Sequence, residues 1–287
     1  MAKRAEAYPD NAPGAFFVDR SCIDCGTCWT FAPEVYRDAQ GHSVVARQPE
    51  GDRQRLRASM ALLACPTASI GTGDKTALAQ AAAAFPVQVD EEVHFCGYTS
   101  EQSFGAWSWL IRRPGGNVLV DSPRAAAPLL KRLAELGGLR WMVLSHRDDV
   151  ADHAVFRQRF GCERAMHRAD GLRGMELEIS GADPVPLDED LLLIPVPGHT
   201  PGSLCLLYRN TYLFTGDHLW WNPEREMLSA SKRFNWHSWP EQLRSLERLL
   251  DFDFRWVLPG HGASRRFEDA SEARRELRRG LEHLKRL

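Results

Sequence analysis

Residues 145–153 read Ser-His-Arg-Asp-Asp-Val-Ala-Asp-His and gather two imidazoles and three carboxylates within nine positions. They come at the end of Leu139–Ser145, an apolar run broken only by Arg140, which predicts a buried strand. Imidazole and carboxylate groups are common protein ligands of zinc, iron and manganese. The stretch therefore predicts a metal site where a strand reaches the edge of its sheet.

Four other pieces of the second half carry the same chemistry, and several of them also follow a predicted apolar strand. They are Leu119-Val120-Asp121, Gly198-His199-Thr200, Thr215-Gly216-Asp217-His218 and Pro259-Gly260-His261-Gly262. Side chains at the ends of neighbouring strands meet at one sheet edge, so we expect these pieces to lie together. A carboxylate such as Asp217 can bridge two ions, whereas the adjacent His218 should point the other way along the chain.

The elements between these motifs predict a layered domain of sheets and helices. Two hairpins are expected at 109–121 and 204–215, helices at 125–136, 239–250 and 270–284, and further strands at 139–145, 191–196 and 255–258. In the last helix Ala270, Ala273, Leu277, Leu281 and Leu284 share one face.

The cysteine pattern of the first 75 residues points to a different cofactor. Cys22, Cys25 and Cys28 are separated by two residues each, and Cys65 follows much later with a proline after it. Three thiolates at this spacing can wrap one face of a cubane cluster while the fourth comes from a distant turn. The alternative is a zinc knuckle, since thiolates at short spacing also bind zinc.

The segment from about residue 15 to 72 resembles the monocluster 4Fe-4S ferredoxins. The resemblance rests on the four cysteines and on the flanking segments 18–19, 32–35 and 64–68, with a helix expected over 52–63. It implies a single 4Fe-4S cluster held by Cys22, Cys25, Cys28 and Cys65. The other cysteines, Cys96, Cys162 and Cys205, match no ligand spacing and are expected as packed core thiols.

The five motifs of residues 92–265 resemble, in their order, the metallo-β-lactamase superfamily. The resemblance implies an αββα sandwich whose metal-bound hydroxide attacks an ester, thioester, lactam or phosphodiester. It also implies that His199 serves one metal and that Asp217 bridges. Asp152, His153 and His261 would then serve the other metal.

The first motif departs from the family order His-x-His-x-Asp-His by two extra residues and by the loss of at least one imidazole. His146 survives, and Asp148 is the natural substitute for the missing ligand, which would favour iron or manganese over zinc. The other interpretation is that Asp148 and Asp149 only cap the helix that starts near Asp152. By resemblance, His146, His199 and Asp217 correspond to the three residues that hold a single iron in persulfide dioxygenases of this fold.

We therefore expect an α+β ferredoxin-like domain at 13–75, a linker at 76–90 and the αββα domain at 91–287. Together, the halves resemble ferredoxin-fused metallo-β-lactamase-like proteins. The formal net charge of -2 gives no basic field for nucleic acid, and no stretch of about 18 apolar residues predicts a membrane span. The first residues lack the apolar run of roughly 7–15 residues of a secretory signal. An odd cysteine count fits a reducing compartment, so we expect a cytoplasmic protein.

Three functions compete at this point. In the first, the chain is a hydrolase of a small-molecule ester or thioester, with one or two zinc, iron or manganese ions and with Asp152 orienting or deprotonating the water. In the second, it is an oxidoreductase whose cluster passes electrons to an iron site near His146, Asp148, His199 and Asp217, with a possible redox partner. In the third, it is a non-catalytic electron carrier or interaction protein. The hydrolase is the leading interpretation. The fusion itself favours the second, since hydrolysis needs no electrons, and the complete-looking second metal site argues against the third.

Overall fold

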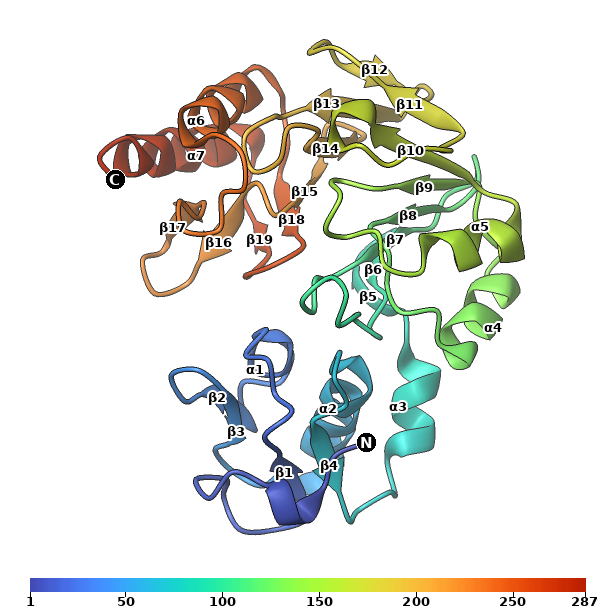
Figure 1. Cartoon of the computed structure of the whole chain (residues 1–287), viewed down its shortest axis with the longest axis vertical. Coiled ribbons are helices and arrows are strands. Elements are labelled where there is room, and N and C mark those ends of the chain that lie inside the picture. Colours follow the sequence, from blue (N-terminus) through green and yellow to red (C-terminus); the bar gives the residue numbers. More distant parts are fainter. The chain divides into compact units, whose positions relative to one another are not determined.

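The computed structural model describes residues 1–287, which form two compact units (Figure 1). The first unit contains residues 1–139 and 151–161, and the second contains 140–150 and 162–287. The division therefore runs through the 145–153 motif, because Asp152 and His153 belong to the first unit while the residues before Ala151 belong to the second. None of the helices is long and apolar enough to cross a membrane.

The first 75 residues build the frame that carries the cysteines. Strand β1 (Phe16–Val18) pairs antiparallel with β4 (Ile70–Thr72), and β2 (Tyr36–Asp38) forms a hairpin with β3 (Ser43–Val45). Helix α1 (Thr27–Phe31) precedes this hairpin, and α2 (Gly51–Ala64) follows it and ends directly before Cys65. The helix predicted over residues 52–63 is confirmed.

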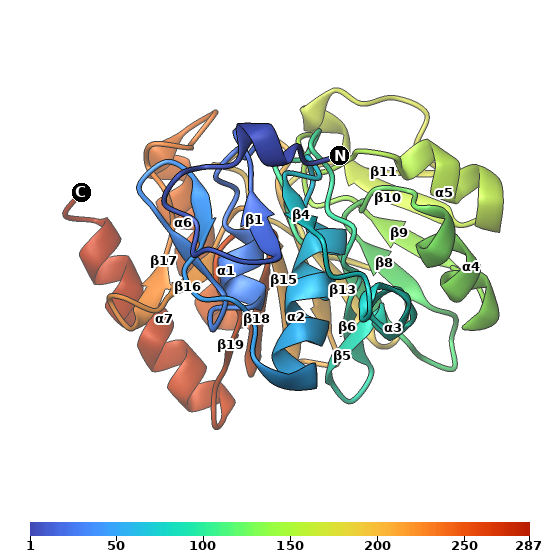
Figure 2. The ribbon, with the colours of Figure 1, turned by 90° about the horizontal axis from the view of Figure 1, so that it is seen from below.

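Helix α2 lies between the β1–β4 pair and helix α3 (Leu78–Ala84), as Figures 1 and 2 both show. Residues 76–90, expected as a linker, contain α3 and then β5 (Val87–Asp90), which pairs antiparallel with β6 (Val93–Phe95). The last four residues of this segment are thus part of a sheet. The division at residues 76–90 remains a proposal.

An aromatic cluster joins the cysteine-bearing segment to the strands that follow it. Phe31, at the end of α1, lies 6.2 Å from Phe85, 5.8 Å from Phe95 and 6.4 Å from Trp107 between ring centroids. Phe95 and Trp107 are stacked at 4.0 Å. Phe31, Phe85 and Phe95 are buried, and aromatic pairs at these distances add to the free energy gained from burying their surface.

The rest of the first unit supplies strands and two helices. β6 pairs antiparallel with β7 (Trp109–Ile111), which pairs with β8 (Val118–Val120). Helix α4 (Ala127–Glu135) follows β8, with Pro128 in its first turn, where a proline costs no helical hydrogen bond. Helix α5 (His153–Phe160) ends at Gly161, which has a positive φ of 69°.

The second unit contains parallel strands and a mainly antiparallel sheet. β9 (Trp141–Val143), β10 (Glu163–His167) and β11 (Leu177–Ile179) are parallel neighbours, with a 3-10 turn at Arg168–Asp170. The second sheet has the order β12-β13-β14-β15-β18-β19. Its strands are Val185–Pro186, Leu191–Pro195, Leu204–Tyr208, Tyr212–Gly216, Trp256–Pro259 and Arg265–Arg266. A separate hairpin joins β16 (Trp220–Asn222) to β17 (Met227–Ser229).

One face of the second sheet is covered by α6 (Trp239–Arg248) and α7 (Ala270–Leu284), which lie side by side in Figure 1. The core there includes Leu213 and Val257 from the sheet and Leu246 from α6. Of the five α7 residues predicted to share one face, Ala273, Leu277, Leu281 and Leu284 are buried, whereas Ala270, in the first turn, is half-buried. Burial of this apolar surface anchors the strands whose ends carry the metal-binding motifs.

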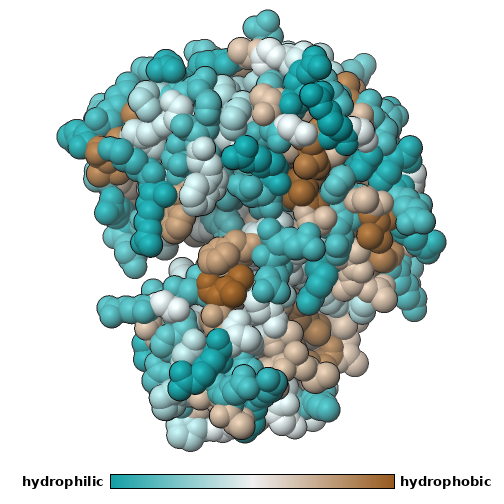
Figure 3. Space-filling model, viewed as in Figure 1, coloured by the Kyte–Doolittle hydropathy of each residue, from teal (hydrophilic) through white to brown (hydrophobic).

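The predicted hairpins, helices and strands of the second half are confirmed, with ends shifted by a few residues. Cys96, Cys162 and Cys205 are buried, as predicted. The surface in Figure 3 is mostly hydrophilic, and its hydrophobic residues lie in separate small areas of the face shown.

Candidate metal centres

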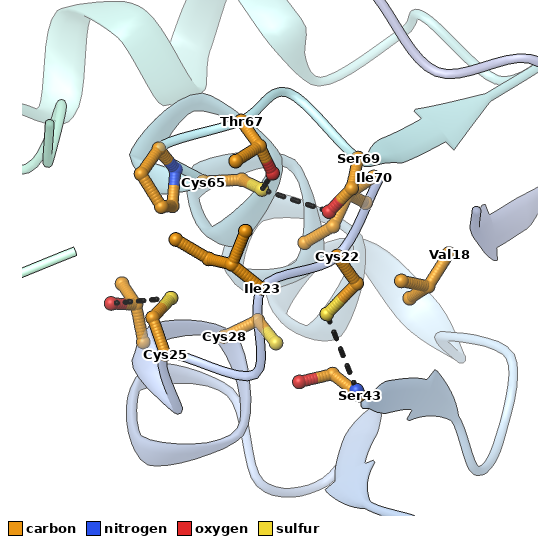
Figure 4. Close-up of a pocket in the computed structure, with 12 residues that line it drawn as sticks. Val18, Cys22, Ile23, Cys25, Cys28, Ser43, Cys65, Thr67, Ser69 and Ile70 are labelled. Carbon is orange, nitrogen blue, oxygen red and sulfur yellow. Dashed lines mark hydrogen bonds between the residues drawn. The ribbon is translucent and has the colours of Figure 1, made fainter. Parts of the chain in front are cut away.

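The structure brings Cys22, Cys25, Cys28 and Cys65 around one hollow of about 280 Å³, including space open to solvent. Figure 4 shows the four sulfur atoms around the side chain of Ile23. Cys22 and Cys25 lie in the loop before α1, Cys28 lies in α1, and Cys65 follows α2. Gly26 makes the turn between them with a φ of 79°, where a side chain would be strained.

Hydrogen-bond donors already point at the sulfur atoms. The backbone N–H groups of Asp24 and Ser43 donate to Cys22 Sγ at 3.5 and 3.4 Å, and the Ser69 hydroxyl lies 3.2 Å from Cys65 Sγ. All four thiols are free. Burial raises the pKa of Cys25 to about 11, so a thiolate at this position needs a positive partner. The iron atoms of a cluster would supply that charge, and the cradle of donors fits such a group.

A second set of potential metal ligands surrounds the Asp217 carboxylate. Its Oδ2 atom lies 3.8 Å from His146 Nε2, 3.9 Å from His199 Nε2 and 3.8 Å from His261 Nε2. His146 follows β9, His199 follows β13, Asp217 follows β15 and His261 follows β18. Four strand ends of the second unit thus bring one carboxylate and three imidazoles together. The sequence predicts a single sheet edge for these residues, but β9 belongs to a different sheet from β13, β15 and β18.

The backbone before Asp217 is shaped for this task. The pairing of β15 with β18 shifts register between Phe214 and Gly216, and such an irregularity turns the following side chain in a new direction. Gly216 has a φ of 49°, and a Cβ there would collide with Ser145 Oγ. At Gly260 a Cβ would lie 2.7 Å from Asp217 Oδ1 and 2.9 Å from Asp149 Oδ2. Both glycines therefore leave room for the donor atoms.

The electrostatics of this donor set fit a cation. Burial alone would favour the neutral acid, but His261, His146 and His199 outweigh it and lower the pKa of Asp217. Burial and the neighbouring His146 lower the pKa of His199 to about 4, so its ring is neutral and able to bind a metal.

Three of these potential metal-ligand atoms have no hydrogen-bond partner. They are His146 Nε2, His199 Nε2 and Asp217 Oδ1. Buried polar atoms without partners are rare in native proteins, because each one costs free energy. A metal ion would satisfy all three, so the residues present fit the group that the motifs imply.

The opposite nitrogens of the rings are held by the protein. His146 Nδ1 lies 3.0 Å from Ser145 Oγ, and the His199 ring hydrogen-bonds the Phe234 backbone carbonyl. Such contacts fix the ring orientation and leave the other nitrogen for a metal.

Asp170 fastens two of the metal-site loops to each other. Its carboxylate accepts hydrogen bonds from Arg147 N at 2.9 Å, Thr200 Oγ1 at 2.8 Å and Gly202 N at 2.7 Å. It is buried at 6% exposure, and these contacts lock the residues that directly follow His146 and His199. Asp170 could not be predicted from the sequence, because no motif or spacing links it to either histidine.

The two aspartates after His146 occupy different environments. Asp148 Oδ2 lies 3.8 Å from His146 Nε2, and the Asp148 side chain is 45% exposed. Asp149 Oδ2 lies 3.9 Å from His146 Nδ1, and the Asp149 side chain is 2% exposed. Each aspartate belongs to a group of side chains whose potential metal-ligand atoms lie close together. Asp148 groups with His146 and His199, and Asp149 groups with His146 and Asp217. Asp149 was considered only as a helix cap, yet the cap position of α5 is Asp152.

Asp152 and His153 lie in the first unit, at the start of α5. Asp152 Oδ2 accepts a hydrogen bond from Ala125 N at 2.7 Å, and His153 is half-buried. Both groups of potential metal ligands that include His146 contain only residues of the second unit. The assignment of Asp152 and His153 to a metal therefore remains a prediction.

His218 is 1% exposed, and neither of its ring nitrogens has a hydrogen-bond partner. Its predicted direction, away from the site, stays a prediction. Burial, with smaller contributions from His199 and His146, lowers its pKa to about 3, so the ring is neutral. Adjacency to Asp217 was the only sequence signal for it.

Comparison with known families agrees with both centres. Residues 18–72 match the 4Fe-4S single cluster domain of ferredoxin I, and residues 103–261 match the metallo-β-lactamase superfamily. The chain thus belongs to the metallo-β-lactamase superfamily, and it carries a ferredoxin-type domain before the metallo-β-lactamase fold. This architecture is the one predicted from the sequence, and it implies an iron–sulfur cluster and divalent metal.

Individual relatives share only part of the chain. A hydroxyacylglutathione hydrolase of Acidiphilium cryptum is 31% identical over 118 residues, which are 39% of this chain and 49% of that protein. One of Anaeromyxobacter dehalogenans is 33% identical over 121 residues, 40% of this chain and 46% of that protein. The chain thus spans about half the length of these relatives.

A solved structure supports the fold. DIM-1 metallo-β-lactamase exposed to ceftazidime superimposes with a TM-score of 0.51 at 16% identity, covering 67% of this chain and 95% of that one.

The cysteine site generates a first prediction. Anaerobically purified protein should be brown, and Cys25→Ala should lose the cluster, since three thiolates and a weak fourth ligand do not hold it stably. Iron and sulfide analysis with visible absorption measures this. Cys96→Ala, at a buried cysteine outside the set, is the control and should keep its colour. A colourless wild-type protein loaded with zinc would rule the cluster out.

Asp170 generates a second prediction. Asp170→Ala should weaken metal binding by about 10–100-fold, because the residues after His146 and His199 lose their common acceptor. Metal titration followed by calorimetry measures the effect. Asp183→Ala, at an exposed aspartate of the same unit, is the control. Unchanged metal affinity in Asp170→Ala would show that the two loops hold their positions without it.

Proposed function

We propose that the chain is a metal-dependent hydrolase of a small-molecule thioester or ester. The observation that carries this proposal is the Asp217 Oδ2 atom at 3.8–3.9 Å from three imidazole nitrogens, two of which, His146 Nε2 and His199 Nε2, have no hydrogen-bond partner. The two relatives named hydroxyacylglutathione hydrolase support a glutathione thioester as the first substrate to test.

The residues divide the work as follows. His146, His199, Asp217 and His261 would hold the metal, with Asp148 or Asp149 as a further oxygen ligand. When bound, a divalent ion supplies Lewis-acid polarisation of the substrate carbonyl and lowers the pKa of water. We assign Asp152 to orienting the attacking water and accepting its proton, and His153 to a second ion.

The carboxylates support a second candidate. Asp148, Asp149 and Asp217 all approach His146, which makes this donor set richer in oxygen than a site of imidazoles alone. Oxygen ligands favour iron or manganese over zinc. With an iron ion here, the ferredoxin-type domain of the same chain could deliver electrons, and the chain would be an oxidoreductase. A non-catalytic electron carrier would need no such donor set.

Hydrolysis is tested with anaerobically purified protein carrying its cluster. With zinc, manganese or iron added, the protein should release thiol from S-lactoylglutathione, measured with a thiol reagent under anaerobic conditions. Asp217→Asn should lower this rate and the metal affinity by about 100-fold or more, because it removes the shared charge, while leaving the cluster absorption unchanged. His237→Ala, at an exposed histidine of the same unit, should match the wild type. Iron beyond the cluster without thiol release would favour the oxidoreductase.

The carboxylate ligand is tested by substitution in pairs. If Asp148 replaces the missing imidazole, Asp148→His should shift the metal preference toward zinc, and Asp148→Asn should weaken manganese binding about tenfold or more. Asp149→Asn is the matched comparison, because Asp149 is buried beside the same histidine. Competition between manganese and zinc, followed by the manganese paramagnetic signal, measures both. Loss confined to Asp149→Asn would transfer the ligand role to Asp149.

A further inference from the structure

The end of helix α2 is hydrogen-bonded to a segment outside the ferredoxin-type domain. The backbone carbonyl of Ala64, directly before Cys65, accepts from Thr99 N at 3.2 Å and from Thr99 Oγ1 at 2.7 Å. Thr99 is fully buried, so water does not compete for this carbonyl. The last turn before one cluster ligand is thereby fixed to residue 99 of the following domain.

Arg124 makes a second connection to the same helix end. Its Nη2 atom donates to the Leu63 carbonyl at 3.2 Å, while its own backbone N–H donates to the Tyr98 carbonyl at 2.8 Å. The residue thus holds Leu63 through its side chain and Tyr98 through its backbone. Tyr98 has a φ of 46°, an unfavourable conformation for a side-chain-bearing residue that needs support from neighbours.

The next residue along the chain reaches the metal-binding motif. Ala125 N donates to Asp152 Oδ2 at 2.7 Å. Arg124 and Ala125 are consecutive, so the backbone that binds Tyr98 also places the donor for Asp152. An unbroken set of contacts therefore runs from Cys65 through Leu63 and Ala64 to Asp152, within one compact unit.

A second contact near the cysteines involves the same loop. Thr27 Oγ1 donates to the Gly105 carbonyl at 3.0 Å, and a Cβ on Gly105 would lie 2.7 Å from Cys25 Sγ. The loop from Tyr98 to Gly105 thus touches the cysteine frame at both of its ends. Any shift of Cys25 or Cys65 on losing the cluster has to be absorbed by this loop.

We propose that the cluster sets the position of the Asp152 carboxylate, and that Arg124 is the positioning residue that connects them. The cluster then acts as a structural support of the metal-binding motif, and its loss frees the segment that carries the Ala125 donor. The importance of this for catalysis rests on the proposed function, which gives Asp152 its role. The coupling itself does not.

Hydrogen–deuterium exchange tests the coupling without a substrate. The reporter amides are those of Thr99, Arg124 and Ala125, because each donates to an acceptor on this path. The cluster is removed from folded wild-type protein with a chelator and an oxidant. Loss of one such bond, worth about 1 kcal/mol, corresponds to about fivefold faster exchange. We expect at least that change at the three amides and none in α7, in the second unit.

Two variants separate coupling from general unfolding. Arg124→Gln should keep the cluster colour and still speed exchange at Ala125 about fivefold, whereas Arg132→Gln, an exposed arginine on α4, should change neither. Arg124→Lys, which keeps a donor, should restore part of the protection. Equal exchange at the three amides with and without the cluster would overturn the proposal, whether or not the protein hydrolyses a thioester.

Discussion

The largely buried Asp217 carboxylate, facing three imidazoles, is the constraint around which the second unit is built. A carboxylate is costly to bury, and here the cost is offset only because three strand ends deliver His146, His199 and His261 to one of its oxygens. This arrangement requires the irregular end of β15 and the small residues beside it. It also requires rings held at their far nitrogens, which the protein provides for His146 and His199.

The two centres position their ligands on different kinds of structure. The cysteine site lies in short loops and one helix turn, and backbone N–H groups approach its sulfur atoms. The second site lies at the ends of strands, where a packed sheet fixes the ligands. Its surplus of carboxylates, Asp148 and Asp149 beside Asp217, gives it a more negative character than three imidazoles and one carboxylate would have. If Asp148 or Asp149 is a ligand, as proposed above, this added negative charge favours iron or manganese over zinc.

Most of the fold and the cysteine site could be predicted from the sequence, because apolar periodicity and ligand spacing are local signals. The second sheet and its helices follow from runs such as Leu204–Tyr208 and the apolar face of α7. Asp170 could not be found, since its three hydrogen bonds reach residues about 20 to 30 positions away. The burial of His218 and Asp149 could not be predicted from the sequence either, because it depends on packing. The hydrogen bond from Ala125 to Asp152 could not be predicted either, because it depends on how two distant segments of the chain fold together.

The aromatic contact of Phe31 with Phe85, Phe95 and Trp107 has a consequence for how such a chain can evolve. A ferredoxin-type domain copied elsewhere without residues 85–107 would display Phe31 to water, and uncovered aromatic surface promotes self-association. The partner strands would lose the same cover. Phe31 and residues 85–107 therefore depend on each other for cover, and a ferredoxin-type domain moved to another protein would need a new aromatic surface in their place.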